Sequence, residues 1–87
     1  MASSDIKQIN PLRRIPFVKE ATGFGRSMLY RNIQKGLFTK PVKLGARSAW
    51  PQHEIEAINR AHIAGKTDEE IRAIVIVLMA ARTEEAA

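Results

Sequence analysis

The chain has 87 residues, enough for one small domain, and it contains no cysteine, which excludes disulfides and thiolate metal sites. Its longest apolar run, "AIVIVLMAA", has nine residues, whereas a membrane-spanning helix needs about 20. We therefore expect a soluble cytoplasmic domain with no signal peptide and no contact with the membrane.

The net charge of +5 is unevenly distributed along the chain. Residues 1–50 hold ten Lys/Arg and two acids, whereas residues 51–87 hold four Lys/Arg and seven acids. A basic half next to a mildly acidic half favours a localised surface for a polyanion. The alternative is ordinary solubilising charge, since charge alone says nothing about fold.

Residues 1–11 are polar and lack periodicity, so we expect a flexible N-terminal arm. Two short helices are predicted next. The first begins near Pro16, where a missing N–H costs no hydrogen bond, and ends at Gly23. The second runs from about Arg26 to Lys35, between two glycines. Two short helices joined by "TGFG" are typical of a helix-turn-helix.

The second helix carries many long hydrogen-bond donors on its outward positions. Leu29 and Ile33 are four residues apart and share the face expected to meet the core. The positions left outside are Arg26, Ser27, Tyr30, Arg31 and Gln34. They form either a solvated face or a recognition surface.

The stretch "TKPVKLGARSAW" changes to the alternation of a strand. Val42 and Leu44 flank Lys43, "GAR" is a turn, and "SAW" returns as a second strand. This predicts a small hairpin that carries Lys40, Lys43 and Arg47. Trp50, which closes the hairpin, is interpreted as a core anchor.

Two further helices are predicted in the C-terminal part. The first covers "PQHEIEAINRAHIAG", with Ile55 and Ile58 on its apolar stripe and His62 as the next, imperfect position. The second runs from about Asp68 to Arg82 after a capping box formed by Thr67 and Glu70.

The last predicted helix is apolar on more than one side. One stripe docks it on the core and consists of Ile71, Ile74, Val75 and Leu78. Ile76, Val77 and Met79 are assigned to a second apolar surface for self-association, which favours a homodimer. The alternative is a helix buried deeply in its own domain.

The sequence offers no catalytic constellation. His53 and His62 are nine residues apart without cysteine partners, no phosphate-binding glycine loop follows a strand, and no serine has a base partner. We therefore expect no enzyme, no metal, no cofactor and no small-molecule substrate.

A basic helix-turn-helix followed by a basic hairpin points to double-stranded DNA. The second helix fits the major groove, where arginine and glutamine pair with base edges. The phosphate contacts are assigned to Arg13, Arg14, Lys35, Lys40, Lys43 and Arg47. An adaptor that works through its apolar last helix is the competing class. RNA binding lacks the paired sheet aromatics of common RNA modules.

The stretch "IPFVKEATGFGRSMLYRNIQKGLFTKPVKLGARSAWPQHEIEAI" resembles the AlpA family of phage-type regulators, which are small relatives of MerR-like and excisionase winged helices. The features that carry the resemblance are the "TG" turn, "RSMLYR", "GLF", "KPVKLGAR" and the tryptophan before "EIEAI". It implies a mainly α fold with a small β-hairpin wing. The winged helix-turn-helix would cover residues 12–64, and residues 65–87 would hold the C-terminal helix.

The resemblance also implies a function. Members of the family act as DNA-binding transcriptional regulators of prophages and integrative elements, or assist excision by bending DNA. By position, Arg26, Ser27, Tyr30 and Arg31 would lie in the recognition helix. Lys43 and Arg47 would lie in the wing. A sequence-specific regulator is the first expectation, and an excisionase-like bending factor is the alternative.

Overall fold

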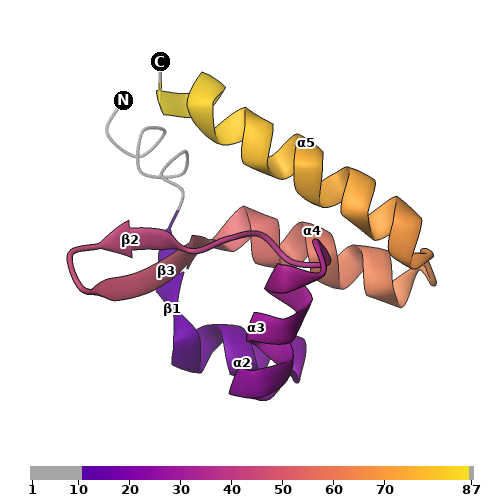
Figure 1. The fold of residues 1–87 in the computed structure, drawn as a ribbon, viewed down its shortest axis with the longest axis horizontal. Helices are drawn as coiled ribbons and strands as arrows, with labels where there is room; N and C mark the ends of the chain where they lie inside the picture. The colour runs from indigo at the N-terminus through magenta and orange to yellow at the C-terminus, as the bar shows by residue number, and fades with distance from the viewer. Residues whose placement is uncertain (1–10, 87) are drawn as a thin grey trace, which may run out of the picture.

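The computed structural model describes residues 11–86, with side chains to Thr83. This part of the chain is mainly helical with one small antiparallel sheet, as predicted for a winged-helix fold (Figure 1). Its elements in chain order are β1 (Leu12–Arg14), α2 (Ile15–Thr22), α3 (Arg26–Gln34), β2 (Val42–Leu44), β3 (Arg47–Pro51), α4 (Gln52–Ile63) and α5 (Asp68–Ala86). The predicted arm, residues 1–11, lies almost wholly outside the described residues.

Helices α2 and α3 form the predicted helix-turn-helix. Pro16 lies in the first turn of α2, and Gly23 ends the helix in the left-handed region with φ +76°. The Gly23 N–H donates to the Lys19 carbonyl at 2.9 Å. Val18 of α2 and Leu29 of α3 are fully buried and hold the two helices on the core. The glycine and proline signals therefore placed both helices correctly.

Strands β2 and β3 form the predicted hairpin, and β1 adds a strand that the sequence did not predict. Strand β3 lies in the centre of the sheet and pairs antiparallel with both neighbours. The loop between Leu44 and Arg47 has two residues, with φ +65° at Gly45 and no positive φ at Ala46. This combination is that of a type II′ turn, whose twist matches the flanking strands. Strand β1 is too short for alternation to reveal it.

Trp50 is the core anchor that the sequence predicted. Its side chain is fully buried, and its ring meets the Phe38 ring edge to face at 6.2 Å between centroids. The indole N–H donates to the Thr39 carbonyl at 2.9 Å. The tryptophan therefore ties β3 to the segment that precedes β2.

The apolar stripe of α4 continues differently from the prediction. Ile55, Ile58 and Ala61 are buried at a spacing of three residues. His62, which the prediction placed on this stripe, is exposed and its ring meets the edge of Phe24. Alanine gives only a weak apolar signal in a sequence, yet the Ala61 side chain lies in the core cluster.

Helix α5 begins at the predicted capping box. The Thr67 N–H donates to Glu70 Oε1 at 2.9 Å, and the Glu70 N–H donates back to Thr67 Oγ1 at 3.2 Å. Ile71 and Val75 are buried in the same core cluster as α2, α3 and α4. Helix α5 is therefore packed on the winged helix, as the predicted docking stripe required.

An ion pair between α4 and α5 has a fully buried carboxylate and a guanidinium side chain that is 21% exposed. Glu54 has no exposed surface, and both of its carboxylate oxygens accept from Arg82, at 2.8 and 2.7 Å. Glu54 lies in the first turn of α4, 28 residues before Arg82, and no pattern in the sequence predicts the pair. The structure places Glu54 in the core because α5 brings a guanidinium to it.

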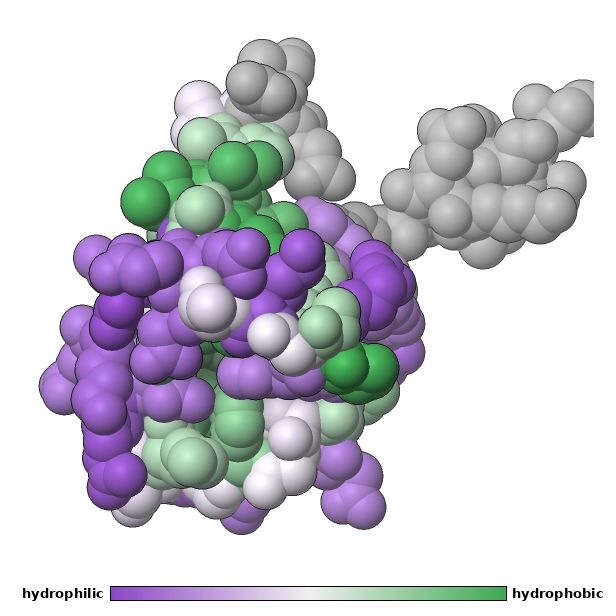
Figure 2. Space-filling view, turned by 90° about the vertical axis from the view of Figure 1, so that its right-hand side faces the viewer, coloured by the Kyte–Doolittle hydropathy of each residue, from purple (hydrophilic) through white to green (hydrophobic). Residues whose placement is uncertain are grey.

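The outer face of α5 carries exposed apolar side chains. Ile76 and Val77 are 68% and 66% exposed, and Figure 2 shows hydrophobic surface at the top of the molecule, over α5. Met79 was assigned to the same surface, but it packs partly buried against the core. The reason is its position four residues after Val75, on the docking stripe. Self-association through Ile76 and Val77 stays a prediction.

None of the helices in residues 11–86 has both the length and the apolar character that a membrane crossing requires.

Thr67→Ala is expected to lower the melting temperature by about 4–8 °C, because the variant loses the hydroxyl cap of α5. Thermal unfolding followed by circular dichroism measures this change in melting temperature.

Glu70 adds a pH dependence to the stability. The hydrogen bond from the Thr67 backbone N–H, with a smaller attraction from Lys66, lowers the pKa of the Glu70 carboxyl.

A carboxyl whose pKa is lowered by folding stabilises the protein above its unfolded-state pKa, and this stabilisation is lost as the pH falls through the folded-state value. Glu70→Ala is therefore expected to flatten the acid side of the stability curve below the usual pKa of glutamate. The matched control is Glu69→Ala, one residue earlier on the same turn. If Glu70→Ala and Glu69→Ala gave the same acid profile, the capping role of Glu70 would be wrong.

Candidate nucleic-acid interface

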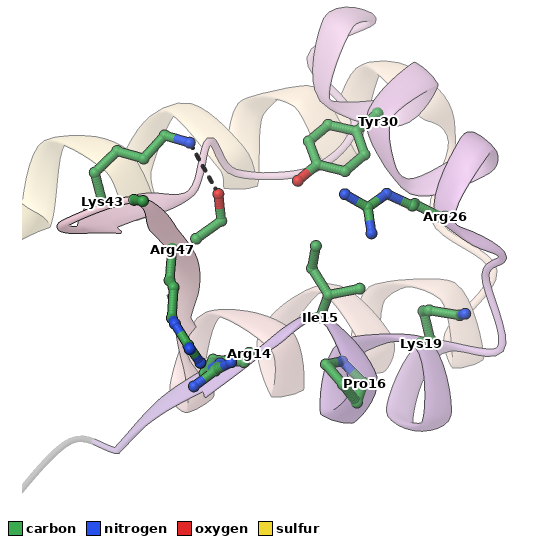
Figure 3. A pocket seen from close by; sticks show the side chains of 10 residues that line it. Arg14, Ile15, Pro16, Lys19, Arg26, Tyr30, Lys43 and Arg47 are labelled. Carbon is green, nitrogen blue, oxygen red and sulfur yellow. Dashed lines mark hydrogen bonds between the residues drawn. The ribbon is translucent and has the colours of Figure 1, made fainter.

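A basic hollow opens between the helix-turn-helix and the wing, with a volume of about 560 Å³ (Figure 3). Every element up to β3 contributes to it. Its lining consists of Arg14, Ile15, Pro16, Lys19, Arg26, Tyr30, Lys43, Ala46, Arg47 and Ser48. We call this set the basic hollow.

The charges of the basic hollow all have one sign. Five of its ten lining residues are lysine or arginine, and no acid is among them. Walls of one charge focus the potential inside a cleft and attract counter-ions into it. The hollow is therefore suited to an anion with several charges, and a nucleic-acid backbone is such an anion.

The wing side of the hollow is built by the hairpin and β1. Lys43 and Ser48 are cross-strand partners, and the lysine Nζ donates to the serine Oγ at 3.0 Å. Arg14 and Arg47 also line the hollow, and Figure 3 shows both side chains on its wing side. This side of the hollow thus has three cations, two of them on the predicted hairpin and one on the unpredicted strand β1.

Arg13 and Arg14 were both assigned to the phosphate contacts, but only Arg14 lines the basic hollow. Successive side chains of a strand point to opposite faces. Arg13 therefore turns the other way, donates to Gln52 Oε1 at 2.7 Å and lies over the Phe17 ring at 4.5 Å. Its guanidinium holds β1 to the start of α4.

The helix side of the hollow is built by α2 and α3. Arg26 and Tyr30 are one turn apart on α3, with the guanidinium 5.9 Å from the ring centroid. Tyr30, which the prediction placed outside, is half-buried against the core. Lys19 of α2 completes this side. Lys19 was not among the predicted DNA contacts. In helix-turn-helix proteins the first helix crosses the DNA backbone, and this rule could have identified a lysine on α2 as a candidate.

The other predicted readers lie beside the hollow. Ser27, Arg31 and Gln34 are exposed on α3 but do not line it. They share one side of the helix because they are four and seven residues apart. We call them the outer face of α3. The N-cap of α3 is Gly25, so no capping side chain accepts hydrogen bonds from the first-turn N–H groups.

Lys35 and Lys40 have exposed side chains that do not line the hollow. Both residues instead use their backbone carbonyls, which accept hydrogen bonds from α5. Among the side chains that the structure describes, which end at Thr83, no three or more histidine or acidic groups are placed together to bind a metal ion.

Sequence comparison identifies the protein family of this chain. The family model described as "Prophage CP4-57 regulatory protein (AlpA)" matches residues 12–63. The chain belongs to the AlpA family. This confirms the resemblance seen in the sequence, and the matched region runs from β1 to the end of α4. All lining residues of the basic hollow fall inside the AlpA match, whereas α5 falls outside it.

A phage protein is also similar to this AlpA-family chain. "Uncharacterized protein ORF88" of Enterobacteria phage P4 is 39% identical over 67 residues, which cover 76% of this chain and 75% of the phage protein. No solved structure matches the chain. The chain is therefore a member of a phage regulatory family.

Proposed function

We propose that this AlpA-family chain is a sequence-specific DNA-binding transcriptional regulator of a prophage or integrative element. The observation that carries the proposal is the basic hollow, in which cations from α2, α3, β1 and the wing surround one open space. Its partner is double-stranded DNA, and its action requires no catalytic chemistry.

The proposed binding mode places α3 in the major groove. Ser27, Arg31 and Gln34 then meet base edges, where arginine pairs with guanine and glutamine with adenine. The basic hollow receives the sugar-phosphate backbone next to that groove, and the wing follows the backbone toward the minor groove. Phosphate contacts fix the position of the protein, while the outer face of α3 reads sequence.

The test is selection from a random duplex library, followed by fluorescence anisotropy on the selected DNA between 50 and 200 mM salt. If the five cations of the hollow each neutralise one phosphate, the slope of log K against log salt is about −4.5. Absence of binding to any duplex at the lowest salt would refute the proposal, because counter-ion release favours every phosphate contact there.

Arg31→Ala is expected to weaken binding to the selected site by about 1–3 kcal/mol and to relax the base preference at one position. The salt slope should change by less than for a residue of the hollow, since Arg31 contacts a base. Lys66→Ala is the matched control, because it removes the same charge from the exposed turn between α4 and α5. Equal loss on all sequences would make Arg31 a phosphate contact instead.

A further inference from the structure

Two arginines of α5 hold the two ends of the segment that joins α3 to β2. The Arg72 Nε–H donates to the Lys35 carbonyl at 2.8 Å, and Arg82 Nη2 donates to the Lys40 carbonyl at 2.7 Å. Figure 1 shows α5 running along α4 and above this segment. We call residues 35–41 the connecting segment.

The connecting segment joins the two DNA-facing elements. Lys35 is the C-cap of α3, and Lys40 stands two residues before β2. Phe38 and Thr39 between them are fully buried. A shift of this segment would therefore move the end of α3 relative to the wing, and with it the two walls of the basic hollow.

The contact at Lys35 is close and specific. Gly36 follows in the left-handed region with φ +77°, and the Arg72 side chain passes 3.7 Å from the place where a Cβ on Gly36 would lie. The last carbonyls of a helix have no partner within the helix. Arg72 supplies one, so the C-terminal end of α3 is capped from α5.

The contact at Lys40 is made by the same guanidinium that pairs with the buried Glu54 carboxylate. Glu54 fixes the Arg82 guanidinium through two hydrogen bonds, and the third goes to the Lys40 carbonyl. A buried pair of this kind adds little net stability over apolar side chains of similar volume. An apolar side chain in place of Arg82 cannot donate the hydrogen bond to the Lys40 carbonyl.

We propose that Arg72 and Arg82 are positioning residues that set the distance between the recognition helix and the wing. The inference rests on the proposed DNA-binding function. It gives α5, which lies outside the AlpA match, a part in binding without any contact to DNA. The DNA-binding core is then correctly shaped only while α5 is docked.

The decisive variant is Glu54→Met/Arg82→Met, which removes both charges and leaves the net charge at +5. Two methionines replace the pair at similar volume, so the fold is expected to remain. Hydrogen exchange should become faster in the connecting segment and β2 and stay unchanged in α2 and α4. Affinity for the selected DNA should fall by about tenfold.

A double-mutant cycle separates positioning from general stability. Lys43→Ala weakens DNA binding through the wing, and in the Glu54→Met/Arg82→Met background we expect this effect to shrink, because the wing is already displaced. Additive effects of Lys43→Ala and the methionine pair would overturn the inference, as would unchanged exchange in the connecting segment.

Arg72→Met keeps the inference testable if the methionine pair fails to fold, since Arg72 is only partly buried. It should speed up exchange at the end of α3 and bind DNA several-fold more weakly than its charge control, Lys66→Met. Equal affinity of Arg72→Met and Lys66→Met would overturn the role of Arg72. If the wild type binds no DNA, the proposed function fails, and the exchange measurements still decide whether α5 positions the connecting segment.

Discussion

Arg82→Met alone is expected to lower the free energy of unfolding by about 3–5 kcal/mol, the cost of breaking a buried ion pair from one side. Glu54 has no exposed surface, and both of its oxygens accept from Arg82. Methionine fills similar space but donates nothing, so a buried carboxylate is left without a partner. Since a domain of this length has a total stability of about 4–13 kcal/mol, the variant loses a large part of it.

Urea unfolding followed by circular dichroism measures the effect of Arg82→Met. Arg60→Met is the matched control, because Arg60 is exposed on α4 and a surface change of this kind costs within about 0.5 kcal/mol. Adding Glu54→Met to Arg82→Met should restore most of the loss. A single variant as stable as the wild type would show that the pair does not anchor α5 in solution.

Lys43→Gln/Arg47→Gln is expected to weaken DNA binding by about 100-fold, since each charged hydrogen bond contributes about 1.5 kcal/mol or more. Both side chains are exposed and line the basic hollow. Among the described side chains, Lys43 donates one hydrogen bond, to the exposed Ser48 hydroxyl, so the variant should keep its stability. The salt slope should become shallower by about 1.8, as two phosphate contacts are lost.

The matched control for the wing variant is Arg60→Gln/Lys66→Gln. It removes the same two charges from α4 and from the turn after it, and both residues are exposed. The control should bind with nearly wild-type affinity and salt slope, because long-range attraction falls off beyond about 10 Å at 0.1 M ionic strength. Equal losses in the two variants would mean that net charge, and not the hollow, determines binding.

The local parts of the fold could be predicted from the sequence. The ends of helices are determined by residues close to them in the sequence. Examples are Gly23, Gly36 and the pair Thr67–Glu70, which could be recognised without knowing the fold. Trp50 has a large apolar side chain whose burial contributes strongly to the core of a small domain, so its core position could be expected from its residue type. The spacing of Leu29 and Ile33 predicts which face of α3 meets the core. The positions on the other side were therefore the candidates for contact with DNA.

The remaining parts depend on contacts between distant residues. Strand β1 exists because β3 provides its hydrogen-bond partners, and nothing in "LRR" announces this. The same strand pairing explains why Arg14 lines the basic hollow whereas Arg13 contacts Gln52 on the opposite face. Glu54 and Arg82 are 28 residues apart, and each has an ordinary surface pattern until α5 docks. Met79 was assigned to the self-association surface with Ile76 and Val77, but its spacing of four residues from Val75 places it on the docking stripe.

The order of the strands has a consequence for how the protein folds. The hairpin of β2 and β3 joins residues that are close in the chain, and hairpins form within about 1–10 μs. Strand β1 must instead find β3 across most of the domain, as the contact between Arg13 and Gln52, 39 residues apart, illustrates, and closing a long loop costs more entropy. The hairpin can therefore form first, although two strands alone are only marginally stable. The basic hollow includes Arg14 of β1, so it is complete only after this distant strand has joined the sheet. Under the proposed function, the time at which a refolding chain begins to bind DNA would report the long-range pairing of β1 with β3.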